Sequence, residues 1–339
     1  SGNGTSAGGK ARTSTPLTTC LLLEAPSTWR FYDGNRRRAA CYRRAFMFPL
    51  RFDFGRKGAS IAVRVILGRR FGAYALELDG LRFDNRFIPA VSGAKRDWRL
   101  LVFPTLGSLR VRNSIVPPGC LLLLPQTLLS AADPANWVTS QGPKVSIVAV
   151  RIEPGNLVDA SSNEVQVVAV SAATVQAFRE LWEPTCVGDS ARALSCGAML
   201  FDELVRDGVA RTTLSKADEQ EGRTLAVRSM EAAFPLLSAL ATKPMLVDIV
   251  ARAGVGERQF LRNIQQVQAE FDLPDRGWRE TIVRWRVTAA VLLLSSDELS
   301  LTEVAQLAGY SGNKTMGRAL SEASLPQGSE LRKQLRDAR

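Results

Sequence analysis

Hydrophobic residues recur at helical spacing in the last hundred residues of the chain, in two groups of similar design. In the first group, Met245–Ala253 predicts a short helix and Gly254 predicts a tight turn, after which a second helix begins. Phe260, Ile264 and Val267 lie on one face of that second helix. Another face carries Arg258, Leu261, Arg262 and Gln265. Two helices joined by a tight turn are typical of a helix-turn-helix unit. The pattern therefore predicts one face of the second helix that packs and one that is free to touch DNA.

The second group repeats this arrangement. Ser300 and Glu303 have the spacing of a capping box, in which each side chain satisfies a backbone N–H group at a helix start. Gly309 predicts the turn before the next helix, and Gly317 within that helix costs ~1 kcal/mol relative to alanine. The residues predicted to pack inward are Leu301, Val304, Ala305, Ala308, Met316, Ala319 and Leu320. Those predicted to point outward are Asn313, Lys314 and Arg318.

A longer segment between the two groups, Glu280–Leu294, is apolar almost all round. One of its stripes contains Ile282, Trp285, Ala289 and Leu292, and another contains Val283, Val287, Ala290 and Leu294. A helix of this kind is buried on several sides. We expect it to act as a strut between the two groups.

Short runs of strand-forming residues, separated by turn residues, dominate the middle of the N-terminal half. The predicted strands are Ile61–Leu67, Gly72–Leu78, Leu100–Pro104, Ser108–Arg112, Cys120–Leu124 and Val145–Arg151, with one more at Val165–Val170. Many short strands at this spacing indicate a β-barrel or a β-sandwich. Three helices are predicted to follow, around Val175–Trp182, Leu194–Val205 and Leu225–Leu240.

The C-terminal segments resemble those of the AraC-type transcription regulators. The resemblance is carried by residues 256–264 (GERQFLRNI), 286–294 (RVTAAVLLL) and 300–305 (SLTEVA), the last followed by Gly309-Tyr310. It implies two helix-turn-helix units whose second helices face the DNA major groove. The positions it assigns to the groove are Arg258, Leu261, Arg262, Asn313, Lys314 and Arg318. The chain departs from the family at Met316 and Leu320, where phenylalanine is usual, and across residues 324–333.

The segment 116–125 (VPPGCLLLLP) is similar to a turn and strand of the cupin-like sensor domains found in the same family. Cupin metal sites need histidine, so a barrel here is expected to be metal-free. The predicted fold is thus α+β, an N-terminal cupin-like β-barrel or sandwich with helices followed by an all-α domain. We divide it into a disordered tail (1–19), a basic β-rich domain (20–160), a helical linker or dimerisation segment (161–240) and a double helix-turn-helix domain (241–339).

The composition limits the possible chemistry, because the 339 residues include no histidine. Histidine-based catalytic triads and most non-thiolate zinc sites are excluded. Five cysteines are scattered without a Cys-x-x-Cys motif, and we expect reduced thiols. An alkyl-transfer enzyme would need an activated thiolate beside a base, and only Cys41 has cations nearby in sequence. We therefore expect no enzyme activity, no cofactor and no metal.

Positive charge is concentrated away from the predicted DNA reader. Residues 1–112 hold 21 Lys and Arg against 7 Asp and Glu, whereas residues 231–339 hold 14 against 13. The N-terminal excess includes Arg36, Arg37, Arg38, Arg43 and Arg44, interleaved with aromatic residues. Such a segment either contacts nucleic acid or an acidic surface of RNA polymerase, or forms a solvated rim around a strand and a helix whose aromatic side chains fill a core.

The leading hypothesis is a sequence-specific transcription regulator, an activator that binds double-stranded promoter DNA. RNA polymerase, a second copy of the chain and an effector of unknown identity are the other expected partners. The alternative is a protein-binding adaptor whose DNA reader has lost its affinity. No apolar run approaches the ~18 residues of a membrane span and no signal peptide is visible, so a cytoplasmic, nucleoid-associated location in a bacterium is expected.

Overall fold

The structure is a computed structural model, and it describes residues 48–68, 70–89, 98–112, 114–125, 133–159, 163–214, 225–237, 240, 245–272 and 278–337. The chain divides into two compact units, residues 1–42 and 43–339, and every described residue belongs to the second unit. The predicted disordered tail and the five arginines Arg36, Arg37, Arg38, Arg43 and Arg44 lie outside the described residues.

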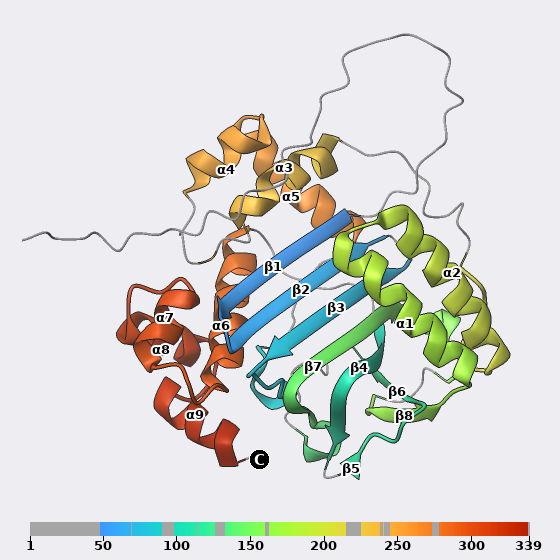
Figure 1. Cartoon of the computed structure of the whole chain (residues 1–339). Helices are drawn as coiled ribbons and strands as arrows, with labels where there is room; N and C mark the ends of the chain where they lie inside the picture. Colours follow the sequence, from blue (N-terminus) through green and yellow to red (C-terminus); the bar gives the residue numbers. More distant parts are fainter. Residues whose placement is uncertain are drawn as a thin grey trace, which may run out of the picture. The chain divides into compact units, whose positions relative to one another are not determined.

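The described strands form one antiparallel sheet in the order β1-β2-β3-β7-β4-β6-β8, with β5 paired to β4 (Figure 1). Their bounds are β1 Phe48–Arg56, β2 Ala59–Leu67, β3 Gly72–Asp79, β4 Arg99–Val111, β5 Ser114–Ile115, β6 Cys120–Pro125, β7 Val138–Ile152 and β8 Gln166–Ala169. Three short 3-10 helices, Asn85–Phe87, Pro134–Asn136 and Pro154–Asn156, lie in the connections. The sequence predicts a barrel or sandwich, whereas this sheet has two edge strands, β1 and β8.

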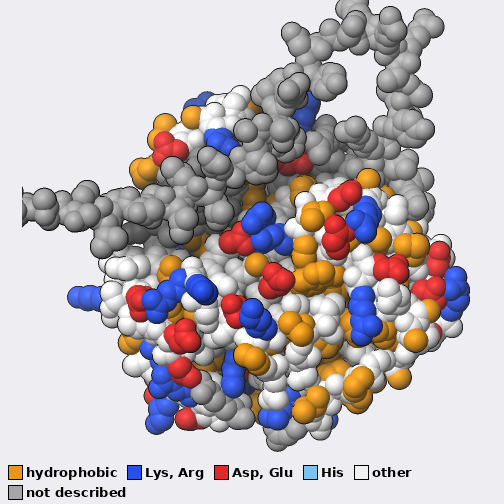
Figure 2. Space-filling view, in the orientation of Figure 1, with side chains coloured by type: hydrophobic (Ala, Val, Ile, Leu, Met, Phe, Trp, Pro, Cys, Tyr) orange, Lys and Arg blue, Asp and Glu red, His pale blue; other side chains and the backbone are white. Residues whose placement is uncertain are grey.

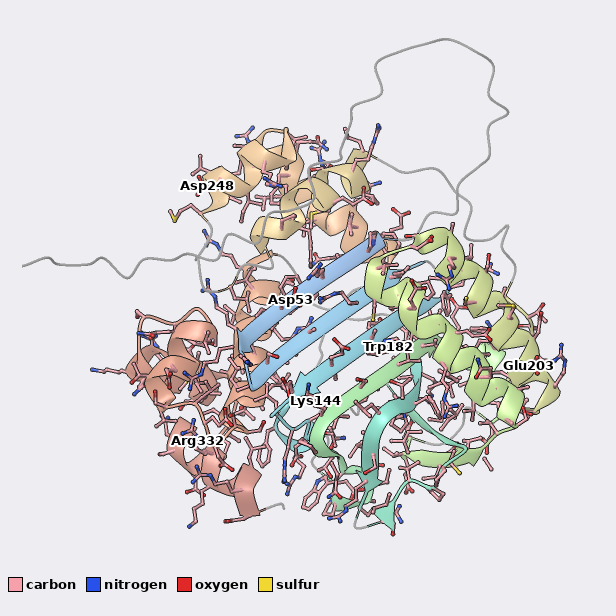
Figure 3. All side chains as sticks on the ribbon, viewed as in Figure 1. Asp53, Lys144, Trp182, Glu203, Asp248 and Arg332 are labelled. Carbon is pink, nitrogen blue, oxygen red and sulfur yellow. The ribbon has the colours of Figure 1, made fainter. Side chains whose placement is uncertain are left out.

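Strand β1 lies in the arginine-rich segment, where one of the two interpretations expects a strand without giving its bounds, and its side chains alternate. Phe52 is buried and Phe54 packs against the same core, whereas Arg51 is exposed. Asp53, labelled in Figure 3, accepts ion pairs from Arg51 at 2.8 Å and from Arg64 on β2 at 2.7 Å. For this part of the arginine-rich segment, the interpretation as a charged rim over core aromatics is therefore correct.

Two predicted strands, Leu100–Pro104 and Ser108–Arg112, are parts of the single strand β4. The interruption is a bulge against β7, with register shifts between Pro104 and Leu106 and between Leu106 and Ser108. Gly107 has a φ of +75°, a conformation that glycine adopts without strain. The prediction of two strands is wrong because a bulge has the same residue signature as a turn.

Each face of the sheet is covered by helices. Helices α1 (Ala172–Val187) and α2 (Ser190–Arg206) pack over one face (Figure 1), and their N-termini are capped by Ser171 and Asp189. The core between these helices and the sheet contains Phe71, Phe103 and Val150 from the sheet side and Phe178 and Phe201 from the helices. Both helices and strand β8 agree with the sequence prediction.

The C-terminal helices share a second core with the opposite face of the sheet. Their bounds are α3 Leu225–Leu237, α4 Leu246–Ala253, α5 Glu257–Glu270, α6 Trp278–Leu294, α7 Leu301–Leu307, α8 Asn313–Glu322 and α9 Gly328–Asp337. This core joins Val65 and Leu78 of the sheet to Phe260, Val287 and Leu320 of the helices. Helix α3 packs against α4 and α5, and both α3 and α7 contact β1.

Helix α6 is less evenly buried than its sequence predicts. Ile282, Val287 and Leu292 are buried, but Val283 is 52% exposed. Trp285 is only partly buried and packs against Phe52 and Phe234. The expectation of burial on every stripe is wrong at Val283, because the packed neighbours leave one side of the helix open at its N-terminal end.

Trp285→Ala is expected to lower the free energy of unfolding by ~3 kcal/mol, which is the low end for truncating a core aromatic, because the ring is only partly buried. The ring meets Phe52 edge-on at a centroid distance of 4.6 Å and Phe234 at 5.8 Å. Chemical denaturation monitored by circular dichroism measures the change. Trp285→Phe keeps an aromatic ring and is the control, with a smaller expected loss. Equal stability of the alanine variant and the wild type would contradict the packing role.

Candidate nucleic-acid interface

Helices α4 and α5 form a tightly connected pair. Gly254 ends α4 at a φ of +66°, and α5 begins after Gly256. Ile249, Phe260 and Val267 are buried, so the face of α5 predicted to pack does so. Asp248, labelled in Figure 3, is exposed in the first turn of α4, where a negative charge is favourable to the helix dipole.

The other face of α5 is open to solvent. Arg258, Arg262 and Gln265 are exposed, and Leu261 is half-buried. Arg258 and Arg262 line a shallow depression at the start of the helix together with Gly256. The structure therefore brings the four predicted positions of this pair onto one accessible surface that can donate several hydrogen bonds from guanidinium groups.

Helices α7 and α8 form the second pair. Ser300 and Glu303 make the predicted capping box, with hydrogen bonds of 3.2 and 2.8 Å. The backbone hydrogen bond from Ser300 lowers the pKa of Glu303, and the Ser300 hydroxyl and the Arg56 charge act in the same direction. Gly309, at a φ of +83°, makes the turn after α7. The capping-box prediction is confirmed.

The outward face of α8 carries Asn313, Lys314 and Arg318, all exposed as predicted. The contacts that these side chains make do not follow from the sequence pattern. Arg318 donates from Nε to Glu322 one turn later at 2.8 Å, and Asn313 donates to the hydroxyl of Thr302 on α7 at 3.3 Å. Both interactions are exposed, so the side chains exchange them readily for other partners.

Helix α9, which the sequence analysis did not predict, explains Gly317. The residue is buried, and a Cβ atom on it would overlap the side-chain oxygen of Gln327, which precedes α9. Gln327 in turn donates to the carbonyl of Gly317 at 3.4 Å and to the hydroxyl of Ser321 at 2.6 Å. Glycine at this position lowers the helix propensity of α8, but it leaves room for the Gln327 side chain to pack against the helix.

Polar contacts join the second pair and the residue after α6 to the sheet region. Arg56 forms an ion pair with Glu303 at 3.0 Å and donates to the carbonyl of Glu298 at 2.9 Å. The backbone N–H of Arg82 donates to the hydroxyl of Ser295 at the end of α6 at 2.8 Å. The capping box of α7 is thus also a contact point with the sheet.

A cavity of about 310 Å³ lies between α6 and the face of the sheet that it covers. Its lining is Val63, Tyr74, Leu76, Phe83, Asn85, Ile88, Leu100, Val102, Leu109, Leu122, Leu124, Val138, Ile147, Ala149, Arg284, Trp285, Thr288 and Leu292. Burial raises the pKa of Tyr74, an effect that the nearby Arg151 charge partly offsets. Sequence patterning did not identify this site, because its residues alternate as in any half-buried strand.

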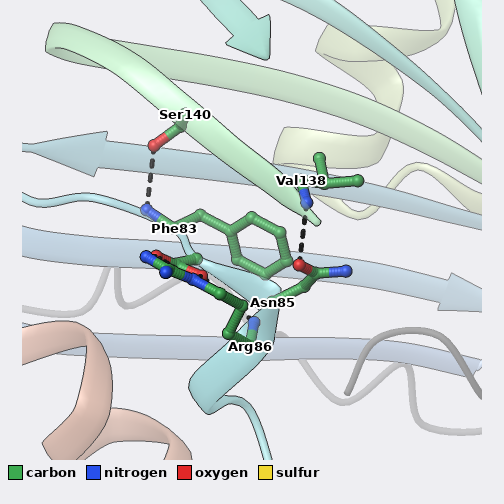
Figure 4. A network of polar contacts seen from close by, with 6 residues as sticks. Phe83, Asn85, Arg86, Val138 and Ser140 are labelled. Carbon is green, nitrogen blue, oxygen red and sulfur yellow. Dashed lines mark hydrogen bonds and ion pairs between the residues drawn. The ribbon is translucent and has the colours of Figure 1, made fainter. Parts of the chain in front are cut away.

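Asn85 contributes less polarity to the cavity than its side chain suggests. Its amide oxygen accepts from the backbone N–H of Val138 at 2.8 Å (Figure 4), and its amide nitrogen donates to the carbonyl of Asn136 at 2.9 Å. In the same network the hydroxyl of Ser140 accepts from the N–H of Phe83. Because these groups are satisfied within the protein, the cavity is predominantly apolar.

Charges of both signs are interspersed on the face of the molecule shown in Figure 2. Among the described residues, no group of three or more metal-binding side chains is present, and Cys120, Cys186 and Cys196 are free thiols. Burial raises the pKa of Cys186 to about 11, which makes its thiol a poor nucleophile. No helix in the described part of the chain is long and apolar enough to cross a membrane.

Comparison with solved structures finds distant likenesses. ToxT from Vibrio cholerae is 10% identical, with a TM-score of 0.31 over 77% of this chain and 98% of that chain. ToxT from Vibrio cholerae strain SCE256 with bound unsaturated fatty acid is 10% identical, with a TM-score of 0.31 over 78% of this chain and 96% of that chain. The AraC-like transcriptional activator CuxR is 8% identical, with a TM-score of 0.27 over 81% of this chain and 86% of that chain. No protein-family model and no curated protein matches the chain. Likenesses at such TM-scores do not establish function, which must be argued from the chain's own residues.

Proposed function

We propose that the chain is a sequence-specific DNA-binding transcription regulator of the AraC type, in which α4–α5 and α7–α8 are helix-turn-helix units. The observation that carries the proposal is the repetition of one arrangement. Each pair has a glycine at positive φ where its first helix ends, at Gly254 and Gly309, and each second helix exposes an arginine-bearing face. A helix presented in this way is suited to enter the DNA major groove.

The exposed side chains suit direct reading of base edges. Arg258, Arg262 and Arg318 have the fork that binds guanine O6 and N7, whereas Asn313 and Gln265 suit adenine. Leu261 offers an apolar contact for a thymine methyl group, and Lys314 suits guanine or a phosphate. We assign all four positions of the α5 face, Gln265 included, and the three positions of the α8 face to base or phosphate contact on this chemistry.

The proposal extends to the wider role of the chain. As an activator it would bind promoter DNA next to RNA polymerase and act on the polymerase, and a second copy of the chain would allow two adjacent sites to be occupied. The sequence of the C-terminal part does not supply a strong non-specific component of DNA binding, since residues 231–339 carry 14 Lys and Arg against 13 Asp and Glu. Specificity therefore depends on a few contacts.

Selection of bound duplexes from a random pool tests the proposal. A regulator enriches one sequence. Its affinity for that sequence falls by ~0.9 logarithmic units per phosphate contact for each tenfold increase in salt concentration. Failure to enrich any sequence, together with salt-insensitive binding, would favour the alternative of a protein-binding adaptor. Transcription from a promoter that contains the selected sequence, with purified polymerase, then tests the activator role.

The cavity supports a second component of the proposed function, response to a small molecule. Ligand sites are typically concave and mostly apolar, with a few polar groups that fix orientation. Here the lining joins sheet residues such as Leu122 to Trp285 and Thr288 of α6, the helix that links the two pairs. An apolar or amphiphilic ligand in the cavity would therefore touch the helix on which both DNA-reading units depend.

Ala149→Phe is expected to fill the cavity and to lower its affinity for an apolar ligand at least tenfold. Ala149 lines the cavity on β7. Fluorescence of the amphiphilic dye 1-anilinonaphthalene-8-sulfonate measures the binding. Ala62→Phe is the matched control, because Ala62 neighbours the lining residue Val63 on β2 and so points to the opposite face of the sheet. Equal dye binding by both variants would contradict a ligand site here.

A further inference from the structure

A buried hydrogen bond joins the sheet to the end of α5. The indole Nε1 of Trp98, just before β4, donates to a carboxylate oxygen of Asp272 at 2.9 Å, and the two residues are 174 positions apart. Trp98 is fully buried and Asp272 is 6% exposed. A hydrogen bond to a charged acceptor in such surroundings is stronger than one in water.

A buried cation lies against the same indole ring. The guanidinium of Arg151 on β7 is 4.3 Å from the centre of the Trp98 ring, and the residue is fully buried. Its Nη2 donates to the carbonyl of Gly68 at 2.9 Å, and its side chain also interacts with that of Tyr74. The Arg151 charge therefore polarises the ring and strengthens the N–H group as a donor to the Asp272 carboxylate.

The backbone at Asp272 adds a second constraint. The residue follows Phe271, the C-terminal cap of α5, and has a φ of +48°. This left-handed conformation is uncommon for residues other than glycine, although aspartate and asparagine tolerate it best. The chain continues from here toward α6, which begins at Trp278. The carboxylate bond thus acts on the residue through which α5 leads to the linking helix.

A similar stack elsewhere in the sheet region makes no such connection. Arg86 lies 4.6 Å from the centre of the Trp137 ring, but the indole N–H of Trp137 has no hydrogen-bond partner among the described residues. The arginine-on-tryptophan contact is therefore shared by both sites. The hydrogen bond to Asp272, an acid that follows a helix distant in the sequence, distinguishes Trp98.

We infer that Trp98 and Asp272, supported by Arg151, are positioning residues that hold the C-terminal end of α5 on the sheet in the orientation that DNA binding requires. The inference rests on the proposed DNA-binding function. Without the bond, Asp272 relaxes from its left-handed conformation and the direction of α5 relative to α6 is no longer fixed. Simultaneous engagement of α5 and α8 with one duplex then becomes less favourable.

Trp98→Phe in the full chain tests the inference, because it keeps an aromatic ring over Arg151 and removes the N–H donor. We expect at least fivefold faster amide hydrogen exchange in the last turn of α5 and a three- to tenfold lower affinity for the duplex selected from the random pool. Trp137→Phe is the matched control and should remain within twofold of the wild type in both measurements. Identical exchange in the two variants, or an unchanged or higher DNA affinity of Trp98→Phe, would overturn the inference.

Substitutions at Asp272 provide a second route should Trp98→Phe fold poorly. Asp272→Asn keeps an oxygen acceptor and tolerates the left-handed backbone but loses the acceptor's charge, so its effects should be smaller than those of Trp98→Phe. Asp272→Gly keeps the backbone conformation but removes the acceptor, so it should reproduce the Trp98→Phe effects. A glycine variant that matches the asparagine variant would exclude the hydrogen bond as the cause. Faster exchange in a chain whose wild type enriches no duplex would contradict the DNA-binding function while leaving the structural tie intact.

Discussion

Gly309→Ala is expected to lower the free energy of unfolding by more than ~3 kcal/mol, since it combines a left-handed penalty of ~1–2 kcal/mol with a steric overlap. Gly309 has a φ of +83°, and a Cβ atom there would overlap the carbonyl oxygen of Leu240. That oxygen also accepts from Arg286 on α6 at 3.4 Å. The substitution therefore disturbs the turn of the second pair and its attachment to α6 together. Chemical denaturation of the full chain gives the measurement.

Gly254→Ala is the matched control for that experiment. Gly254 makes the corresponding turn of the first pair at a φ of +66°, but no atom lies within 4 Å of the position a Cβ would occupy. Only the backbone penalty of ~1–2 kcal/mol applies. Similar losses in the two variants would show that the overlap with Leu240 relaxes without cost, and would remove the distinction between the two turns.

Arg262→Ala is expected to weaken binding to the selected duplex by ~1–3 kcal/mol while leaving binding to random DNA almost unchanged, because a bidentate base contact carries discrimination that a phosphate contact does not. The side chain is exposed on α5 and shares a depression with Arg258. Competition binding at fixed salt measures both affinities. Arg228→Ala, at an exposed position of α3 outside both pairs, is the control.

Two outcomes would revise the assignment of individual arginines. If Arg262→Ala retains the wild-type preference for the selected duplex, α5 does not read bases through this residue. Arg318→Ala should behave like Arg262→Ala, although the wild-type side chain must first leave Glu322. A uniform loss of affinity across all sequences would instead make Arg318 a phosphate contact.

Features of the structure that depend on neighbouring residues could be predicted from the sequence. The capping box at Ser300 and the apolar face of α5 follow from helix periodicity and from backbone groups within one turn. The exposure of Arg258 and Asn313 follows from the same periodicity. Contact of these side chains with DNA remains a prediction, as does the division of the chain into domains.

Features that depend on distant contacts could not be predicted. The apolar alternation in β1 was obscured by its arginines, whose acidic partners lie on β1 itself and on α7. The bond between Trp98 and Asp272 joins the residue before β4 to a residue just after α5, 174 positions along the sequence. No spacing rule relates two such residues. The cavity could not be predicted from the sequence either, because it forms only where α6 lies across the sheet.

The position of β1 gives the C-terminal helices a protective role that is separate from DNA. Among the described strands β1 lies at an edge of the sheet, and α3 and α7 contact it while Phe52 packs against Phe234 and Trp285. A bare edge with unpaired backbone groups and exposed aromatic rings is a template for aggregation. Removing the helices from Leu225 onward would thus leave a sheet that adds strands from neighbouring molecules. The two halves of this chain are therefore better produced, stored and engineered as one piece.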